Sequence, residues 1–302
     1  MRSTPRSLRP LSFLAAFAAS LTCCVTGCGQ HGLSPPEKMT LAGPVTVPLE
    51  LVEGRLVVSA KVNGRGPFKF ILDSGAEVSL LADTFATEAG LPSEGEMQVG
   101  SPGSKTPKTA AITPVEKLEI GGLVVENFTT LAMDLAGLQK RVPGLVGVIS
   151  AQMLDGLLVS YDYPAGQMHF LRNELPAADG KTVFDWPRGQ RKPSVVMDVA
   201  GEAIRVDIDS GSQGTFTLAQ KNVGKLAWLE APVERNPIKL VDTEYKAWRG
   251  RLKGTISFGQ FSFENPSLAY HEGPFNNVGY PVLKDFVFTI DPANRRFELR
   301  KP

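Results

Sequence analysis

The stretch FILDSGAEVSLL, residues 70–81, places one carboxylate between an apolar run and a Ser-Gly turn, after which the chain becomes apolar again. The same arrangement returns as VDIDSGSQGTFTL at residues 206–218. A single Asp-Ser-Gly favours a structural turn over catalysis, because the tripeptide is common in loops. Two copies in matching surroundings raise a different hypothesis, that one site is built from two halves of the chain.

The sequence around both turns also repeats. Residues 62–76 match residues 199–212 with a one-residue gap. Residues 148–170 align with residues 277–299, with Ser150 opposite Gly279 and Asp162 opposite Asp291. Self-similarity over about half of the chain predicts two copies of one structural unit.

The pattern of apolar residues predicts an all-β fold. Short β-type runs are separated by Gly, Pro and Asn turns, as expected for strands joined by tight connections. The clearest runs are residues 45–52, 55–62, 68–72, 117–120, 123–133 and 157–163. Two helices are predicted, at residues 81–90, closed by Gly90, and at residues 217–228, each just after an Asp-Ser-Gly turn.

Composition narrows the class of protein. With 302 residues, 42% of them hydrophobic, the chain is long enough for about two domains. Its 32 basic residues balance 31 acidic ones, and no basic block is interleaved with aromatic residues, so a nucleic acid partner is not expected. All cysteines lie within the first 28 residues, which leaves the rest without a disulfide, a thiolate nucleophile or a Cys-ligated metal.

The N-terminus is predicted to be a targeting segment. Residues 1–27 combine three arginines with a short apolar run, as in a bacterial signal peptide. The motif VTGC, residues 25–28, resembles a lipobox, in which Cys28 is lipidated and becomes the new N-terminus. The alternative is an ordinary secretory signal that ends in Cys. We expect a membrane-anchored lipoprotein of the bacterial cell envelope, facing the periplasm or the exterior, with residues 28–43 as a tether.

Two carboxylates within hydrogen-bond distance can perform hydrolysis without a cofactor. They cannot both ionise cheaply, so they share one proton. The ionised member can accept a proton from a water molecule while the protonated member polarises a carbonyl group. Amide hydrolysis is the obvious use of such a pair.

The two turns resemble those of aspartic proteases of the pepsin and retropepsin clan, over nearly all of residues 44–302. The resemblance is carried by ILDSGA (71–76), by DIDSGS (207–212) and in part by NVG (277–279), where the family has two apolar residues and Gly. It implies a bilobal double β-barrel with homologous retropepsin-like lobes at residues 44–172 and 173–302, the active site between them, and a monomer that resembles a fused retropepsin dimer.

The same resemblance assigns roles to residues. Asp73 and Asp209 are the expected catalytic pair, facing each other across a cleft, and Ser74 and Ser210 are expected to hydrogen-bond across the interface. The supporting turns are completed by Gly75, Ala76, Gly211 and Ser212. A hairpin flap should cover a peptide or protein substrate, and residues 97–112 and 238–252 are the candidates, although packing explains their apolar residues equally well.

Some positions depart from the family pattern. Ser150 stands where Gly is expected, and a side chain there is expected to crowd Asp73; Gly147 would restore the motif only by a three-residue shift. Asp207 occupies the position of Ile71, which lines a candidate substrate pocket in the family. Either Asp207 selects a basic substrate side chain, or it pairs with nearby Arg205 or Arg249.

No metal or other cofactor is expected, because His31, His169 and His271 lack companions with ligand spacing. The leading hypothesis is an envelope-anchored aspartic endopeptidase; the alternatives are an inactive peptide-binding lipoprotein and a purely structural one. Ser212 offers a hydroxyl donor that Ala76 lacks. With one donor fewer, the pair should keep its shared proton to higher pH, so we expect a working pH nearer neutral than that of a gastric enzyme.

Overall fold

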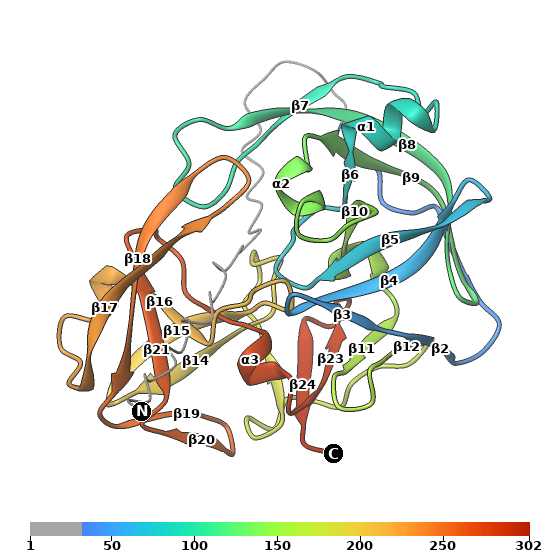
Figure 1. The fold of residues 1–302 in the computed structure, drawn as a ribbon. Helices are drawn as coiled ribbons and strands as arrows, with labels where there is room; N and C mark the ends of the chain where they lie inside the picture. The colour runs from blue at the N-terminus through green and yellow to red at the C-terminus, as the bar shows by residue number, and fades with distance from the viewer. Residues whose placement is uncertain (1–31) are drawn as a thin grey trace, which may run out of the picture.

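The computed structural model describes residues 32–302 and consists mostly of β-strands, which form three sheets (Figure 1). The prediction of an all-β protein is confirmed at this level. The predicted signal peptide at residues 1–27, Cys28 and the first residues of the tether lie outside the described residues. Within residues 32–302, no helix is long and apolar enough to cross a membrane.

The first sheet has nine strands, all from residues 38–150. Their order is β1-β9-β6-β10-β5-β4-β8-β7, with β3 paired to β4 and a further pairing between β8 and β9. The strands are β1 (Lys38–Leu41), β3 (Glu50–Val52), β4 (Arg55–Val62), β5 (Arg65–Asp73), β6 (Leu80–Ala82), β7 (Glu96–Val99), β8 (Lys108–Ile120), β9 (Leu123–Met133) and β10 (Leu145–Ser150). Because β8 pairs with β9, this sheet folds back on itself.

The second nine-stranded sheet comes from the other half of the chain, in the order β17-β18-β21-β16-β22-β15-β14-β19-β20. The strands are β14 (Ser194–Val199), β15 (Glu202–Ile208), β16 (Phe216–Ala219), β17 (Trp228–Lys239), β18 (Glu244–Leu252), β19 (Thr255–Phe258), β20 (Phe261–Glu264), β21 (Ser267–His271) and β22 (Asn277–Val278). In Figure 1 it lies beside the first sheet, with the hairpins β7–β8 and β17–β18 close together.

A six-stranded sheet joins the two halves, in the order β13-β24-β23-β11-β12-β2. Its strands are β2 (Val45–Pro48), β11 (Leu158–Asp162), β12 (Gln167–Leu171), β13 (Val183–Asp185), β23 (Val287–Asp291) and β24 (Arg296–Arg300). The strands β11 and β23, which the sequence repeat aligns, pair antiparallel at its centre. One hydrophobic cluster extends through all three sheets, so the halves are packed on a shared core.

The sequence repeat appears again in the strand order. The series β9-β6-β10-β5-β4 recurs as β21-β16-β22-β15-β14, and in both series the third strand runs parallel to the fourth. The hairpins β4–β5 and β14–β15 turn at equivalent places, through Asn63 and Gly64 (φ 48° and 77°) and through Ala200 and Gly201 (φ 52° and 92°). Two left-handed residues suit the twist of a tight hairpin, which explains the glycine in each copy.

The predicted helix at residues 81–90 is confirmed as α1 (Asp83–Glu88), followed by Gly90 at φ 69°. The predicted helix at residues 217–228 is wrong. Its first residues continue β16, which pairs with β21 on one side and β22 on the other, and only the short 3-10 helix η2 (Gln220–Asn222) follows. Pairing with two neighbours outweighs the local helical preference here. The remaining short helices are α2 (Ala136–Gln139), α3 (Tyr280–Leu283) and the 3-10 helix η1 (Ala151–Leu154).

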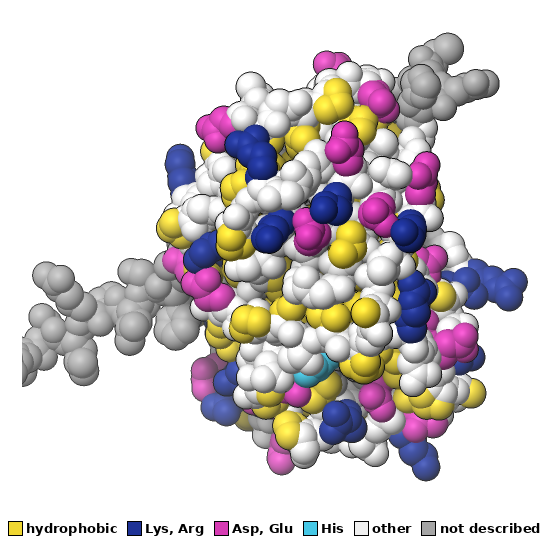
Figure 2. Space-filling model, turned by 90° about the vertical axis from the view of Figure 1, so that its right-hand side faces the viewer, with side chains coloured by type: hydrophobic (Ala, Val, Ile, Leu, Met, Phe, Trp, Pro, Cys, Tyr) yellow, Lys and Arg dark blue, Asp and Glu magenta, His cyan; other side chains and the backbone are white. Residues whose placement is uncertain are grey.

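Part of the segment predicted as a tether is a strand. Residues 38–41 form β1, which pairs antiparallel with β9, and Met39 and Leu41 pack against the core. The alternation of these two apolar residues with polar ones is the period of a half-buried strand. On the face shown in Figure 2, basic and acidic side chains are mixed, without a large area of one sign.

Candidate active site

The two aspartates of the repeated turns lie together in the structure. Asp73 ends β5 and Asp209 follows β15, and the two residues are only 2% and 1% exposed. A Cβ atom added to Gly75 would lie 2.5 Å from Cγ of Asp209, and one added to Gly211 would lie 2.5 Å from Cγ of Asp73. Each carboxyl group therefore rests on the glycine backbone of the opposite turn.

The Asp73 and Asp209 side chains lie close enough for each to influence the pKa of the other. Each turn also holds its own aspartate: Gly75 N donates to Asp73 Oδ1 at 2.7 Å, and Gly211 N donates to Asp209 Oδ1 at 3.0 Å. Each glycine thus binds the aspartate of its own turn through its backbone N–H. Because it has no side chain, it also leaves room for the carboxyl group of the opposite turn.

Ser74 and Ser210 connect the two turns by four reciprocal hydrogen bonds. Each backbone N–H donates to the other serine's hydroxyl oxygen at 2.9 Å. Each hydroxyl then donates to a carbonyl oxygen of the opposite strand, Ser74 to Ile208 O at 2.9 Å and Ser210 to Leu72 O at 3.2 Å. The two serines hydrogen-bond across the interface, as the resemblance implied, through their hydroxyl and backbone N–H groups. This cross-link fixes the relative position of the two turns.

The two carboxyl groups differ in their electrostatic surroundings. Burial and then the charge of Asp209 raise the pKa of Asp73 well above its ordinary value. Burial also raises the pKa of Asp209, but the Lys192 ammonium group and the Asn277 amide act in the opposite direction. A single shared proton is therefore held more strongly by Asp73, and the negative charge is more stable on Asp209.

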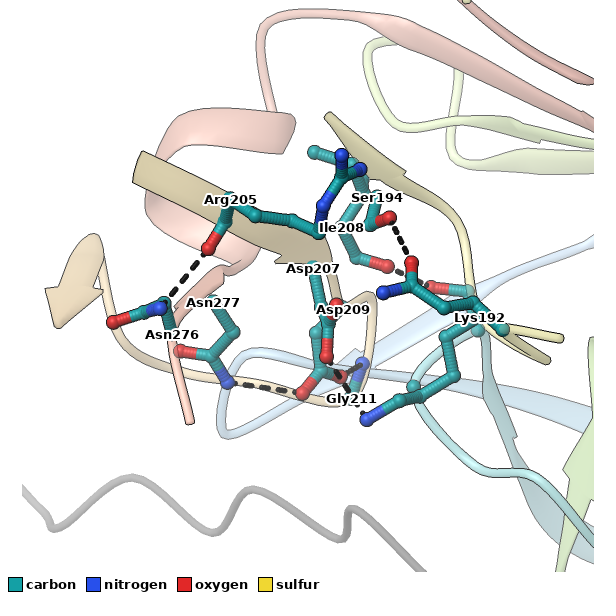
Figure 3. Close-up of polar contacts among 12 residues, drawn as sticks. Lys192, Ser194, Arg205, Asp207, Ile208, Asp209, Gly211, Asn276 and Asn277 are labelled. Atoms are coloured by element: carbon teal, nitrogen blue, oxygen red, sulfur yellow. Dashed lines mark hydrogen bonds and ion pairs between the residues drawn. The ribbon is translucent and has the colours of Figure 1, made fainter. Parts of the chain in front are cut away.

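Asn277 is a site residue that the sequence did not identify. From β22 its Nδ2 donates to Asp209 Oδ2 at 3.0 Å (Figure 3). The repeat places Asn277 opposite Val148. In the structure, Asn277 is aligned with Asp207 and Val148 with Ile71, and each of these partners lies two residues before an aspartate. The signal that could have identified Asn277 is an amide at the position where the first half has the aliphatic Val148; both residues are buried.

Lys192 is the second residue that the sequence did not identify. Its Nζ lies 2.9 Å from Asp207 Oδ2, and Figure 3 shows its side chain extended toward Asp207 and Asp209. Burial disfavours its charge, but the carboxylates of Asp207, Asp209 and Glu77 outweigh burial and raise the pKa of Lys192. Asp207 thus pairs with Lys192 instead of the Arg205 or Arg249 suggested from the sequence, and buried Ile71 occupies the equivalent place in the first half.

The position of Ser150 in the motif suggested that its side chain would crowd Asp73, but in the structure the hydroxyl has other partners. Its hydroxyl donates to Ala76 O at 2.6 Å and accepts from Gln152 N at 3.2 Å, where it caps η1. At the equivalent Gly279 a Cβ would lie 2.6 Å from Gly214 O, so a side chain has no room there. In the second turn, the Ser212 hydroxyl accepts from Gly214 N at 3.1 Å, and the side chain that donates to Asp209 is the Asn277 amide.

Both candidate flap segments form hairpins whose tips contact each other. Residues 97–112 include parts of β7 and β8, and residues 238–252 include the end of β17 and all of β18. At the tips, Ser101 N donates to Asp242 Oδ1 at 3.1 Å, and Tyr245 Oη donates to Pro102 O at 2.7 Å. Trp248 instead stacks on Tyr270, with ring centroids 5.2 Å apart, so that aromatic residue is explained by packing.

No metal centre is evident in the described part of the chain, residues 32–302, since it has no cluster of three or more His, Cys, Asp or Glu side chains suited to a cation. His169 lies by Thr46, with Nδ1 and Oγ1 2.9 Å apart. His271 packs against Phe275, with ring centroids 4.0 Å apart. These two histidines lie in different parts of the fold.

Comparison with protein families finds a match to part of the chain. Residues 58–158 match the model of a family described as aspartyl protease. The matched segment begins in β4, includes the Asp73 turn and ends at the start of β11, so it contains the first of the two aspartates and not the second. Comparison with curated proteins finds no match.

Proposed function

We propose that this protein is an aspartic endopeptidase that hydrolyses peptide bonds with a water molecule activated by Asp73 and Asp209. The observation that carries the proposal is the pair of buried carboxyl groups, one from each copy of the repeat, that pack against each other's turns. The family match over residues 58–158 supports a protease-type function for the half that contains Asp73.

The asymmetry of the pair supports different roles for the two aspartates. Asp209, whose negative charge is stabilised by Lys192 and Asn277, accepts a proton from the attacking water. Asp73, which holds the shared proton, donates a hydrogen bond to the carbonyl oxygen of the scissile bond. The water oxygen bonds to the carbonyl carbon, and the proton on Asp209 is available for the leaving amine when the C–N bond breaks.

The proposal includes a bilobal arrangement, with lobes at residues 44–172 and 173–302 and the substrate between them. The two nine-stranded sheets and their shared strand order support this division. The hairpins β7–β8 and β17–β18 would act as two flaps, because their tips already contact each other. Opening of this contact would admit a peptide to the buried carboxyl groups.

The proposed location is the bacterial cell envelope, with the protein anchored through lipid on Cys28. It rests on the sequence of residues 1–28 alone. Replacement Cys28→Ala should move the protein from the membrane fraction to the soluble fraction. Unchanged membrane association of that variant would show that Cys28 is not the anchor.

The test of activity is a peptide library incubated with the purified protein at several pH values. Asp73→Asn and Asp209→Asn should each abolish cleavage, while Asp179→Asn, a change at an aspartate that caps a loop, should leave it intact. Peptide binding without cleavage by the unmodified protein would favour the inactive binding protein instead. The two features that suggested that alternative, Ser150 and Asp207, have structural partners in Ala76 and Lys192.

A further inference from the structure

The repeat places two basic side chains at equivalent positions beside the carboxyl pair. Val57 of β4 pairs with Ile71, and Ser194 of β14 pairs with Asp207, so these two pairs correspond. Arg55 precedes Val57 by two residues, and Lys192 precedes Ser194 by two. Arg55 and Lys192 are therefore counterparts: Arg55 is the first residue of β4, and Lys192 lies two residues before β14 begins.

The charge of Lys192 is compensated within the protein. Asp207 forms an ion pair with it at 2.9 Å. Glu77, four residues after Asp73 in the opposite turn, adds a second carboxylate whose field favours the charged form of Lys192. This end of the site therefore contains its own acidic partners.

Arg55 meets neutral residues at both corresponding positions. Ile71 stands in place of Asp207, and Gln213, four residues after Asp209, stands in place of Glu77. The turn that precedes Arg55 lies against this glutamine, because a Cβ on Gly54 would be 3.4 Å from Cγ of Gln213. Figure 1 shows this β3–β4 turn close to α3, where Tyr280 also lies 3.5 Å from the same Cβ position.

The two terminal nitrogens of the Arg55 guanidinium are buried without an acceptor in the described part of the chain. The residue is 1% exposed, and within residues 32–302 neither Nη1 nor Nη2 has a hydrogen-bond partner. The Gln213 Oε1 atom likewise has no partner, so the amide does not satisfy the guanidinium. Burial and then the neighbouring Arg141 lower the pKa of Arg55 to about 10, against the carboxylates of Glu53, Asp73 and Asp209, which act in the opposite direction. Arg55 is therefore positively charged at neutral pH.

A buried charged donor without a partner is unfavourable by several kcal/mol in general, so such a group indicates an acceptor that arrives from outside. Arg55 lies close enough to the reacting groups to be influenced by both Asp73 and Asp209. These two aspartates are buried to a similar degree as Arg55. The inference requires that the opening that admits substrate to the pair also exposes the guanidinium.

We infer that Arg55 forms a subsite for a substrate carboxylate, and that the enzyme selects peptides with an acidic group near the scissile bond. The guanidinium can bind a carboxylate through two parallel hydrogen bonds, which an ammonium group cannot do with the same geometry. The acidic group is either a Glu or Asp side chain or the C-terminal carboxylate of the substrate. This inference rests on the proposed protease function, and it is the reverse of the basic preference that Asp207 suggested from the sequence.

The experiment uses matched peptides that carry Glu, Gln or Lys at each position around one scissile bond, with free or amidated C-termini. At one position, or at the C-terminus, the carboxylate should raise kcat/KM about ten- to a hundredfold over its neutral counterpart. Equal cleavage of the Glu and Gln peptides and of free and amidated termini would overturn the subsite, as would a preference for Lys.

Gln213→Glu is the variant that tests the mechanism directly. It gives Arg55 an internal carboxylate at the position where Lys192 has Glu77, so the preference for acidic peptides should disappear while neutral peptides are still cleaved. Arg55→Gln should have the same effect on the preference if it folds. Lys192→Gln, the matched change in the other half, should alter the pH profile and keep the ratio of Glu to Gln peptides. Persistence of the acidic preference in Gln213→Glu would contradict the inference.

The two levels of the proposal fail differently. If no peptide is cleaved under any condition, the protease function itself is wrong. If peptides are cleaved and cleavage depends on Asp73 and Asp209, but the acidic group has no effect, only the role of Arg55 is wrong.

Discussion

The two aspartate-bearing turns share equivalent backbone hydrogen bonds to their aspartates and differ in the groups that hold them. In the first turn, Ala76 O accepts a hydrogen bond from the Ser150 hydroxyl, whereas in the second, Ser212 O accepts from the backbone N–H of Tyr280 at 2.8 Å. The second turn needs Gly279 for this close backbone approach. In the first turn, the hydroxyl of Ser150 takes the place of that backbone N–H. The comparison shows that the repeat preserves the position of the turn and leaves the way it is held free to change.

The electrostatic environment differs even more than the hydrogen bonds. Asp209 has an amide and an ammonium group beside it, and Asp73 has mainly burial and the other carboxyl group. A homodimer of identical halves would have identical surroundings on both aspartates. Duplication within one chain allows the negative charge and the proton to be assigned to different residues.

The largest expected effect tests the part that the halves share. Gly75→Ala and Gly211→Ala each place a Cβ against the opposite carboxyl group, so each should lower kcat/KM by about a hundredfold or more. The two losses should be similar, because the glycines have equivalent contacts. Gly224→Ala is the control, since no atom lies within 4 Å of its added Cβ. A severe loss in only one of the two turns would show that the turns are not equivalent.

The next prediction concerns the serine cross-link. Ser74→Ala and Ser210→Ala each remove one acceptor and one donor and leave a buried N–H of the opposite serine without a partner. Each should reduce the free energy of unfolding by about 2 to 3 kcal/mol, measured by denaturant titration. The exposed Ser262→Ala on β20 should change it by less than about 0.5 kcal/mol. A strong effect of one serine and none of the other would contradict the reciprocal arrangement.

A third prediction tests the asymmetry of charge. Asn277→Val gives the second half the aliphatic residue that the first half has at Val148. Without the amide donor the ionised form of Asp209 is less stable, so both protons remain on the pair to higher pH and the acidic limb of activity should shift upward by about one pH unit. The raised pKa of Asp73 should place the alkaline limb above the ordinary range of a carboxyl group.

Ser212→Ala is the informative comparison for Asn277→Val. From the sequence, the Ser212 hydroxyl was expected to be the extra donor to the second aspartate, but in the structure its oxygen accepts from Gly214. The acidic limb should therefore move less in Ser212→Ala than in Asn277→Val. The reverse order would restore the earlier assignment.

Features that depend on neighbouring residues in the sequence could be predicted, and features that depend on contacts between distant parts of the chain could not. The strands could be recognised because the alternation of apolar and polar residues is local in the sequence. The two turns could be recognised because their short motif occurs twice. The helix expected at residues 217–228 failed because β16 is decided by pairing with distant strands. Asn277, Lys192 and Arg55 were missed because their importance depends on which groups they face across the fold, and no motif in the chain marks that.

The smallest expected effect concerns the contact between the two hairpin tips. Asp242→Ala removes the acceptor for Ser101 N, and Tyr245→Phe removes the donor to Pro102 O. Both groups are half-buried, so each change should alter the free energy of unfolding by no more than about 1 kcal/mol. If the tips form a gate over the carboxyl pair, each variant should raise KM about two- to fivefold with little change in kcat, because the closed state that holds the peptide becomes less populated. The double variant should cost less than the two single changes combined, since either change already opens the same contact. A reduced kcat with unchanged KM would show that the tips act on the chemical step rather than on access.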